Sequence, residues 1–166
     1  MYYGLDSAGL PAVKRYLRDM DGMVPWTWWP YEEVGHSQDG LKELMKLFGR
    51  EEGFLTAKPP TLIERILQIA TSNDSVVADF FAGSGTTAQA AIASNRKDGG
   101  RRRFVLVESG EHFDRLLVGR TKKVTYSPEW KNGKPSRLAT AEEAERSPRI
   151  VKAIRLESYE DTLNNL

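Results

Sequence analysis

The fold depends on the stretch Ser75-Val76-Val77-Ala78-Asp79-Phe80-Phe81-Ala82-Gly83-Ser84-Gly85-Thr86-Thr87. Its first seven residues form a nearly continuous apolar run, which predicts a buried strand of a parallel sheet. An alanine-rich helix is predicted from Thr86 to about Ser94. The glycines between strand and helix allow the backbone to turn sharply and to approach a ligand closely. Because the first turn of a helix has unpaired N–H groups and a partial positive charge, this turn suits an anionic ligand group.

The elements on either side of this stretch continue the alternation of helices and strands. A helix is predicted after Pro59 and Pro60, because proline is favourable in the first turn of a helix. The next strand is predicted at Arg103–Glu108, followed by a helix from Ser109 to about Val118. This order predicts an α/β core at residues 56–123 with a doubly wound, mostly parallel sheet.

Two acidic residues, Asp79 and Glu108, stand at the ends of the two predicted strands. Glu108 lies 23 positions after Gly85, near the roughly 20 at which a ribose-binding acid follows such a glycine turn. The pair predicts an adenosine-containing cofactor at the carboxyl ends of the strands. Two alternatives stay open: a structural tight turn with solvated strand ends, and a dinucleotide site, because residues 83–88 fit the loose G-x-G-x-x-A pattern.

The segment 1–55 is expected to lead into the core. Its stretch Val24–Tyr31 has two prolines and four aromatic residues, so regular structure is not expected there. We interpret these aromatic side chains as core or as a wall of the ligand pocket rather than as a base-stacking surface. A helix is predicted from about Asp39 to Phe48. An earlier helix is predicted by the apolar stripe Val13, Tyr16, Leu17 and Met20.

The segment 124–166 is expected to extend the core with a hairpin, a helix and a strand. Val124–Tyr126 is predicted to be extended, and Asn132-Gly133 is typical of a hairpin turn. Thr140 resembles the start of a helix. Ile150–Leu156 alternates as a strand does.

Composition excludes several classes of function. The 166 residues carry a net charge of +1 and include no cysteine, which excludes disulfides and thiolate catalysis. The two histidines, His36 and His112, are too far apart in sequence to suggest a metal site. No apolar run approaches the roughly 20 residues that span a bilayer, and the N-terminus does not resemble a signal peptide. A cytoplasmic protein without a membrane partner is expected.

The small net charge conceals a basic block at residues 96–123. This block holds nine basic and four acidic side chains, a net charge of +5. It could face nucleic-acid phosphates, or it could be a solvated surface of helices and loops.

Several motifs together resemble one family of enzymes. Residues 79–87 resemble the S-adenosylmethionine-binding motif of amino-group DNA methyltransferases, which methylate adenine N6 or cytosine N4. Thr56-Ala57-Lys58-Pro59-Pro60 and the residues after it resemble the helix that precedes this motif in the permuted β-type members. Residues 126–135 and 156–165 are similar to modification subunits of type III restriction–modification systems.

The resemblance implies a partial Rossmann-like methyltransferase fold with S-adenosylmethionine as the cofactor. Glu108 is then expected to accept hydrogen bonds from the ribose hydroxyls, and Phe81 or Phe113 to pack on the adenine or else to belong to the core. The residues implied to bind the cofactor are Lys58, Pro59, Asp79, Phe80, Phe81, Ala82, Gly83, Ser84, Gly85, Thr86, Thr87 and Glu108.

The catalytic tetrapeptide of this family, Asp/Asn/Ser-Pro-Pro-aromatic, does not occur in the sequence. Lys58-Pro59-Pro60-Thr61 lacks the polar acceptor and the aromatic residue, and Ser127-Pro128-Glu129-Trp130 lacks the second proline. No catalytic residue is therefore expected here. The resemblance implies the C-terminal, cofactor-binding part of an adenine-N6 methyltransferase, inactive alone, and the catalytic and target-recognition part of that methyltransferase is an implied partner. DNA, a restriction subunit and a second copy are the other implied partners.

Two further functions stay open at this stage. The chain could be a non-catalytic module that docks DNA or another subunit through residues 26–31, the basic block and residues 155–166. It could also be an NAD-binding oxidoreductase domain, although neither histidine is well placed for hydride chemistry.

Overall fold

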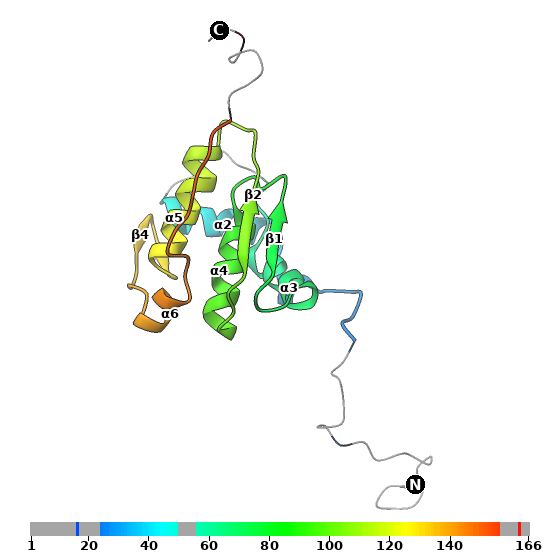
Figure 1. Cartoon of the computed structure of the whole chain (residues 1–166). Helices are drawn as coiled ribbons and strands as arrows, with labels where there is room; N and C mark the ends of the chain where they lie inside the picture. The colour runs from blue at the N-terminus through cyan, green and yellow to red at the C-terminus, as the bar shows by residue number, and fades with distance from the viewer. Residues whose placement is uncertain (1–15, 17–23, 50–55, 157–162, 164–166) are drawn as a thin grey trace, which may run out of the picture.

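A short parallel sheet lies at the centre of the structure, a computed structural model that describes residues 16, 24–49, 56–156 and 163 (Figure 1). Strands β1 (Val76–Asp79) and β2 (Arg103–Leu106) pair in parallel, with Val76 opposite Arg103. Helix α4 (Thr86–Asp98) connects them. The predicted strand–helix–strand unit is therefore confirmed.

Helices cover one face of this sheet. Val77 and Phe104 pack with Leu67 of α3 (Pro60–Ala70) and with alanines of α4. On the other face, Val76 and Val105 are each about half exposed. The expectation of a fully buried strand is wrong, because the described helices pack against one face only and burial alternates along each strand.

Helix α4 is defined by its two ends. It starts after Gly85 and stops at Gly99, both in the left-handed region, where glycine has no steric penalty. The helix continues one turn beyond the predicted end at Ser94. Near its end, the buried side chain of Asn95 accepts from the backbone N–H of Arg102 and donates to its carbonyl, at 3.0 and 2.9 Å. These bonds fix the start of β2 against α4.

Helix α2 (Ser37–Phe48) packs beside the core, and the short α1 (Tyr31–Val34) precedes it. Leu47 of α2 is buried with Ile92 and Val124. Gly40 is buried against the backbone of Ala57, since a Cβ atom at Gly40 would lie 2.0 Å from that carbonyl oxygen. The segment that carries Lys58 and Pro59 is thus held against α2.

The chain after β2 differs from expectation. The sequence predicts a helix that stops near Val118 and an extended segment at Val124–Tyr126. Instead, a π-helical turn at Phe113–Val118 continues directly into α5 (Gly119–Tyr126). Val124 is buried in the core through α5, so its apolar character reflects a helix face. The extended prediction for Val124–Tyr126 is therefore wrong.

The C-terminal hairpin and helix are confirmed. Strands β3 (Trp130–Lys131) and β4 (Lys134–Pro135) pair antiparallel around Asn132 and Gly133, which both have positive φ. Helix α6 (Ala141–Glu145) starts with a capping box between Thr140 and Glu143.

Two other expectations fail. Residues 150–156 run without regular secondary structure, because no strand of the described chain pairs with them. Trp26 and Trp28 lie in an irregular segment, as predicted, but they are 76% and 77% exposed, so they are neither core nor pocket wall. The helix predicted around residues 13–20 falls outside the described residues except for Tyr16. No helix within the described part is long and apolar enough to cross a membrane.

Candidate functional site

Asp79, the last residue of β1, ties the glycine turn to the helix that follows it. One carboxylate oxygen accepts from the N–H of Phe81 at 3.1 Å, and the other accepts from the hydroxyl of Thr87 at 2.5 Å. The carboxylate therefore holds both ends of the turn. This role explains why an acidic residue stands at the end of the strand. The alternative, that Asp79 is only a solvated strand end, does not explain these two hydrogen bonds.

The turn itself lies across the ends of both strands. Gly83 and Gly85 have φ values of 54° and 81°, which other residues rarely adopt. The N–H of Ala82 donates to the carbonyl of Val107 at 3.1 Å. The turn is thus anchored to the chain that continues from β2.

Glu108 holds the turn from the β2 side. Its two oxygens accept from the backbone N–H groups of Gly83 and Gly110, each at 2.7 Å, and His112 lies 3.5 Å away. Burial raises the pKa of this carboxyl, but the hydrogen bonds from Gly110 and Gly83 outweigh burial, so the pKa lies below its ordinary value. The carboxylate is therefore ionised at neutral pH and has spare acceptor positions, since two oxygens offer about four.

The segment before α3 meets the start of α4. The hydroxyl of Thr86 donates to the carbonyl of Lys58 at 3.3 Å. Pro59 is buried, whereas the Lys58 side chain is exposed. The backbone of Lys58 therefore lies beside the start of α4, and a role of Lys58 and Pro59 in binding the cofactor stays a prediction.

The aromatic residues of the turn point outward. Phe80 is 66% exposed and Phe81 is 92% exposed, so the alternative that Phe81 belongs to the core is wrong. Phe113 is partly buried. In contrast, Ala82, Ser84, Thr86 and Thr87 are buried beneath them. An apolar, exposed side chain beside a rigid polar turn can cover the flat face of a ligand ring.

Sequence reasoning missed Arg120, which lies beneath the turn. Its side chain is fully buried and donates to the hydroxyls of Ser84 and Thr86, each at 2.9 Å. A signal was present in the sequence: Arg120 follows the buried Leu116 and Leu117 by four and three positions, which places a cation on the apolar face of its helix. By charge alone, Arg120 is one of the nine cations of the basic block.

The basic block is divided between the interior and the surface. Arg102 is buried and donates to Thr71, Asn73 and Asp98. With Arg120 also buried, the block is not one solvated face. Arg101 and Arg103 are exposed.

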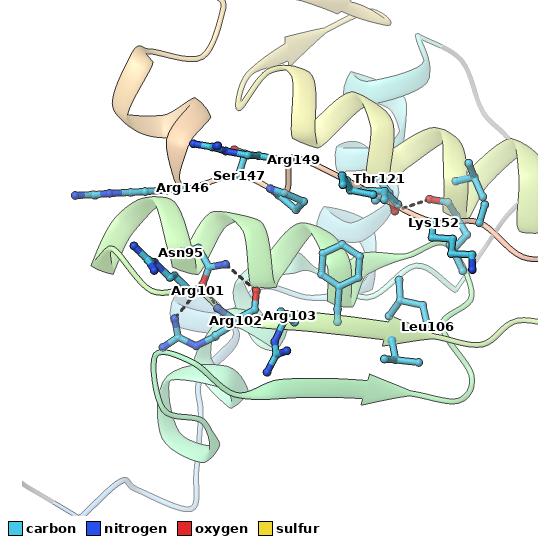
Figure 2. Close-up of a pocket in the computed structure, with 18 of the residues that line it drawn as sticks. Asn95, Arg101, Arg102, Arg103, Leu106, Thr121, Arg146, Ser147, Arg149 and Lys152 are labelled. Atoms are coloured by element: carbon cyan, nitrogen blue, oxygen red, sulfur yellow. Dashed lines mark hydrogen bonds between the residues drawn. The ribbon is translucent and has the colours of Figure 1, made fainter.

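A cavity lies away from the glycine turn. It has a volume of about 820 Å³ and runs between β2 and residues 145–154 (Figure 2). Phe104 and Leu106 line its β2 side, while Arg149 and Lys152 line the opposite segment. The cavity follows the edge of β2 that does not pair with β1, beside the segment that was predicted to be a strand.

The arrangement at the turn fits an adenosine ligand with an anionic group. The start of α4 offers free N–H groups, Glu108 offers acceptors for a diol, and Phe81 offers an exposed ring. Among the described residues, no group of acidic and histidine side chains could hold a metal ion.

Comparison with known proteins identifies the family. The model of the N6/N4 DNA methylase family matches residues 12–118. The chain is 42% identical over 129 residues to the type III restriction-modification enzyme StyLTI Mod subunit of Salmonella typhimurium, covering 76% of this chain and 19% of that protein. It is 46% identical over 92 residues to the EcoPI Mod subunit of Escherichia phage P1, covering 55% and 13%.

A third relative is a methyltransferase of a different type. The type II methyltransferase M.KpnI of Klebsiella pneumoniae is 36% identical over 110 residues, covering 66% of this chain and 26% of that protein. The chain thus spans only 13% to 26% of the length of these three relatives. The family match covers more than half of the chain and includes the glycine turn. The chain belongs to the N6/N4 family of DNA methylases.

Proposed function

We propose that this chain is the S-adenosylmethionine-binding part of a DNA adenine-N6 methyltransferase of a restriction–modification system. The observation that carries the proposal is the glycine turn, which Asp79 and Glu108 hold between β1 and α4 in a chain of the DNA methylase family. The small parallel sheet with helices on one face fits part of a Rossmann-like methyltransferase fold. In this assignment residues 56–123 form the cofactor core, residues 1–55 lead into it and residues 124–166 extend it.

The residues around the turn have defined roles in this proposal. The start of α4, at Thr86 and Thr87, binds the carboxylate of the methionine part. Glu108 accepts hydrogen bonds from the ribose hydroxyls through its spare lone pairs, while it keeps Gly83 in place. Phe81 covers the adenine, as its exposure allows. Lys58, Pro59, Asp79, Phe80, Ala82, Ser84 and Gly85 complete the site.

When bound, S-adenosylmethionine supplies an electrophilic methyl group for an amino nitrogen of a flipped-out base. The chain's own contribution is to bind and orient this donor, because positioning can supply a large part of such a rate. The Asp/Asn/Ser-Pro-Pro-aromatic motif is absent from this sequence. The catalytic and target-recognition part is therefore proposed as a partner, together with DNA, and the proposal extends to a restriction subunit and a second copy of the chain.

Calorimetry of the whole chain with S-adenosylmethionine, S-adenosylhomocysteine and NAD tests the proposal. Saturable binding of both adenosylated ligands is expected, and both should be lost or weakened in Glu108→Ala. Glu111→Ala is the matched control, because Glu111 is exposed and three residues away. A folded chain that binds neither ligand, or that binds NAD more tightly, would refute the assignment.

A second candidate function is docking to DNA or to another subunit without catalysis. The observation that favours it is the exposure of Trp26 and Trp28, because exposed aromatic rings can stack on bases. Arg101 and Arg103 add exposed cations beside the cavity. A DNA-binding titration at several salt concentrations tests this role, since phosphate contacts give a log-linear loss of affinity with salt. Unchanged binding and salt dependence after Arg101→Glu and Arg103→Glu would exclude the basic residues from it.

A further inference from the structure

The guanidinium of Arg120 is fully buried and only partly satisfied by hydrogen bonds. Its Nε donates to the side-chain oxygen of Gln89 at 2.7 Å, and its Nη1 donates to Ser84 and Thr86. Its Nη2 is buried without a hydrogen-bond partner among the described residues. The group thus has two hydrogen-bonded nitrogens, Nε and Nη1, and one buried nitrogen without a partner among the described residues.

No carboxylate pairs directly with this cation in the described part of the chain. Glu43 of α2 accepts from the amide of Gln89 at 2.7 Å, and so reaches Arg120 only through that amide. Burial lowers the pKa of Arg120 to about 10, and the charge of Glu43 opposes the shift. Arg120 is therefore a buried positive charge at neutral pH.

A buried charge of this kind is costly for stability. Desolvation of a cation costs several kcal/mol, and apolar side chains of similar volume are often no less stable in such positions. Leu116, Leu117 and Val124 occupy the same helix face and show that apolar residues pack there. The contacts that distinguish Arg120 from a leucine are its hydrogen bonds to Gln89, Ser84 and Thr86, and two of these three partners belong to the glycine turn or the start of α4.

We propose that Arg120 is a positioning residue for the cofactor site. Its guanidinium holds the hydroxyls of Ser84 and Thr86, and through them the backbone of the glycine turn at the start of α4. Its charge, which pairs directly with no described carboxylate, also adds to the positive potential at that helix start, and this potential favours a carboxylate. This inference rests on the proposed S-adenosylmethionine site and adds to it the residue that shapes the turn from below.

The test compares Arg120→Gln with Arg120→Lys in the whole chain. Lys122→Gln is the matched control, because Lys122 is exposed on the same helix. Calorimetry uses two probes, S-adenosylmethionine and 5′-methylthioadenosine, which lacks the amino-acid part and its carboxylate. Two-dimensional NMR follows the backbone amides of Gly83 and Gly85.

We expect Arg120→Gln to weaken S-adenosylmethionine binding by about 10- to 100-fold, as expected for the loss of hydrogen bonds from a charged group. Methylthioadenosine binding should weaken less, and the lysine variant should recover part of the loss. The amides of Gly83 and Gly85 should shift in Arg120→Gln and stay in place in the control. A purely structural arginine would weaken both probes equally.

The outcomes separate this inference from the proposed function. Normal S-adenosylmethionine affinity in a folded Arg120→Gln variant overturns the inference and leaves the proposed site intact. If the wild-type chain binds neither probe, the proposed function fails, and unchanged turn amides in Arg120→Gln then overturn the positioning role as well. If Arg120→Gln does not fold, Ser84→Ala takes its place, because it removes one of the two hydroxyls that Arg120 contacts. Wild-type affinity for S-adenosylmethionine, with unshifted amides of Gly83 and Gly85, would then overturn the inference.

Discussion

Substitution of Glu108 gives the sharpest prediction, because one side chain joins the two loops that follow β1 and β2. Glu108→Ala removes both acceptors for the N–H groups of Gly83 and Gly110, which lie 2.7 Å from the carboxylate oxygens. Glu108→Gln keeps one oxygen but turns an amide N–H₂ toward the other donor. The glutamine side chain therefore preserves the volume and removes the charge.

The magnitude follows from these two contacts. A hydrogen bond to a charged group contributes about 1.5–3 kcal/mol, and a neutral one about 1 kcal/mol. Two such bonds to a side chain that is only 12% exposed lead us to expect about 3–6 kcal/mol of destabilisation for Glu108→Ala. Glu108→Gln should lose a similar amount, because it places two donors face to face. Loss of the ribose acceptor should add at least about tenfold weaker cofactor binding, or about 1.4 kcal/mol.

Urea unfolding followed by circular dichroism measures the first effect, with Glu111→Ala as control, and calorimetry measures the second. Stability within about 0.5 kcal/mol of wild type, as for ordinary surface substitutions, would refute the role of Glu108 in holding the turn. If Glu108→Ala loses stability as expected but binds the cofactor with wild-type affinity, only the ribose contact would be refuted.

Three more substitutions test the packing and the C-terminal unit. Gly40→Ala should destabilise the fold by about 1–3 kcal/mol in urea unfolding, because its Cβ would lie 2.0 Å from the carbonyl oxygen of Ala57; wild-type stability would show that α2 can move away. Leu47→Ala should cost about 2–5 kcal/mol by the same measurement, since Leu47 is 1% exposed in the core, and a much smaller loss would mean that this core collapses around the deletion. Hydrogen bonds lower the pKa of Glu143 from an ordinary 4.5 to about 2; the largest effect comes from Arg137 and the next from the backbone N–H of Thr140. The carboxylate of Glu143 therefore stabilises α6 fully above about pH 4.5, and this stabilisation is lost as the pH falls toward 2. Hydrogen exchange of α6 across that range should show this loss in wild type and not in Glu143→Gln; equal profiles would exclude the carboxylate.

Much of the central unit could be predicted because its signals are local. An apolar run, two glycines and an alanine-rich stretch lie within twenty residues and specify strand, turn and helix without help from distant parts. The Asn132-Gly133 turn and the capping box at Thr140 are equally short-range, and both are observed. The strand predicted at residues 150–156 failed because a strand needs a partner, and alternation in one segment contains no information about that partner.

The order of the elements, the glycine turn and the acidic residues at the strand ends can be predicted from the sequence, because they depend on neighbouring residues. The contacts of those residues depend on the packing of distant segments. Arg120 meets Ser84 across 36 positions, and Glu108 meets Gly83 across 25. Arg120 is buried and contacts the glycine turn because α5 packs against that turn; its position in the basic block does not predict this. The packing of α3 and α4 likewise determines that only one face of β1 and β2 is covered. An apolar strand could be covered on one face or on both, so its sequence does not distinguish the two cases.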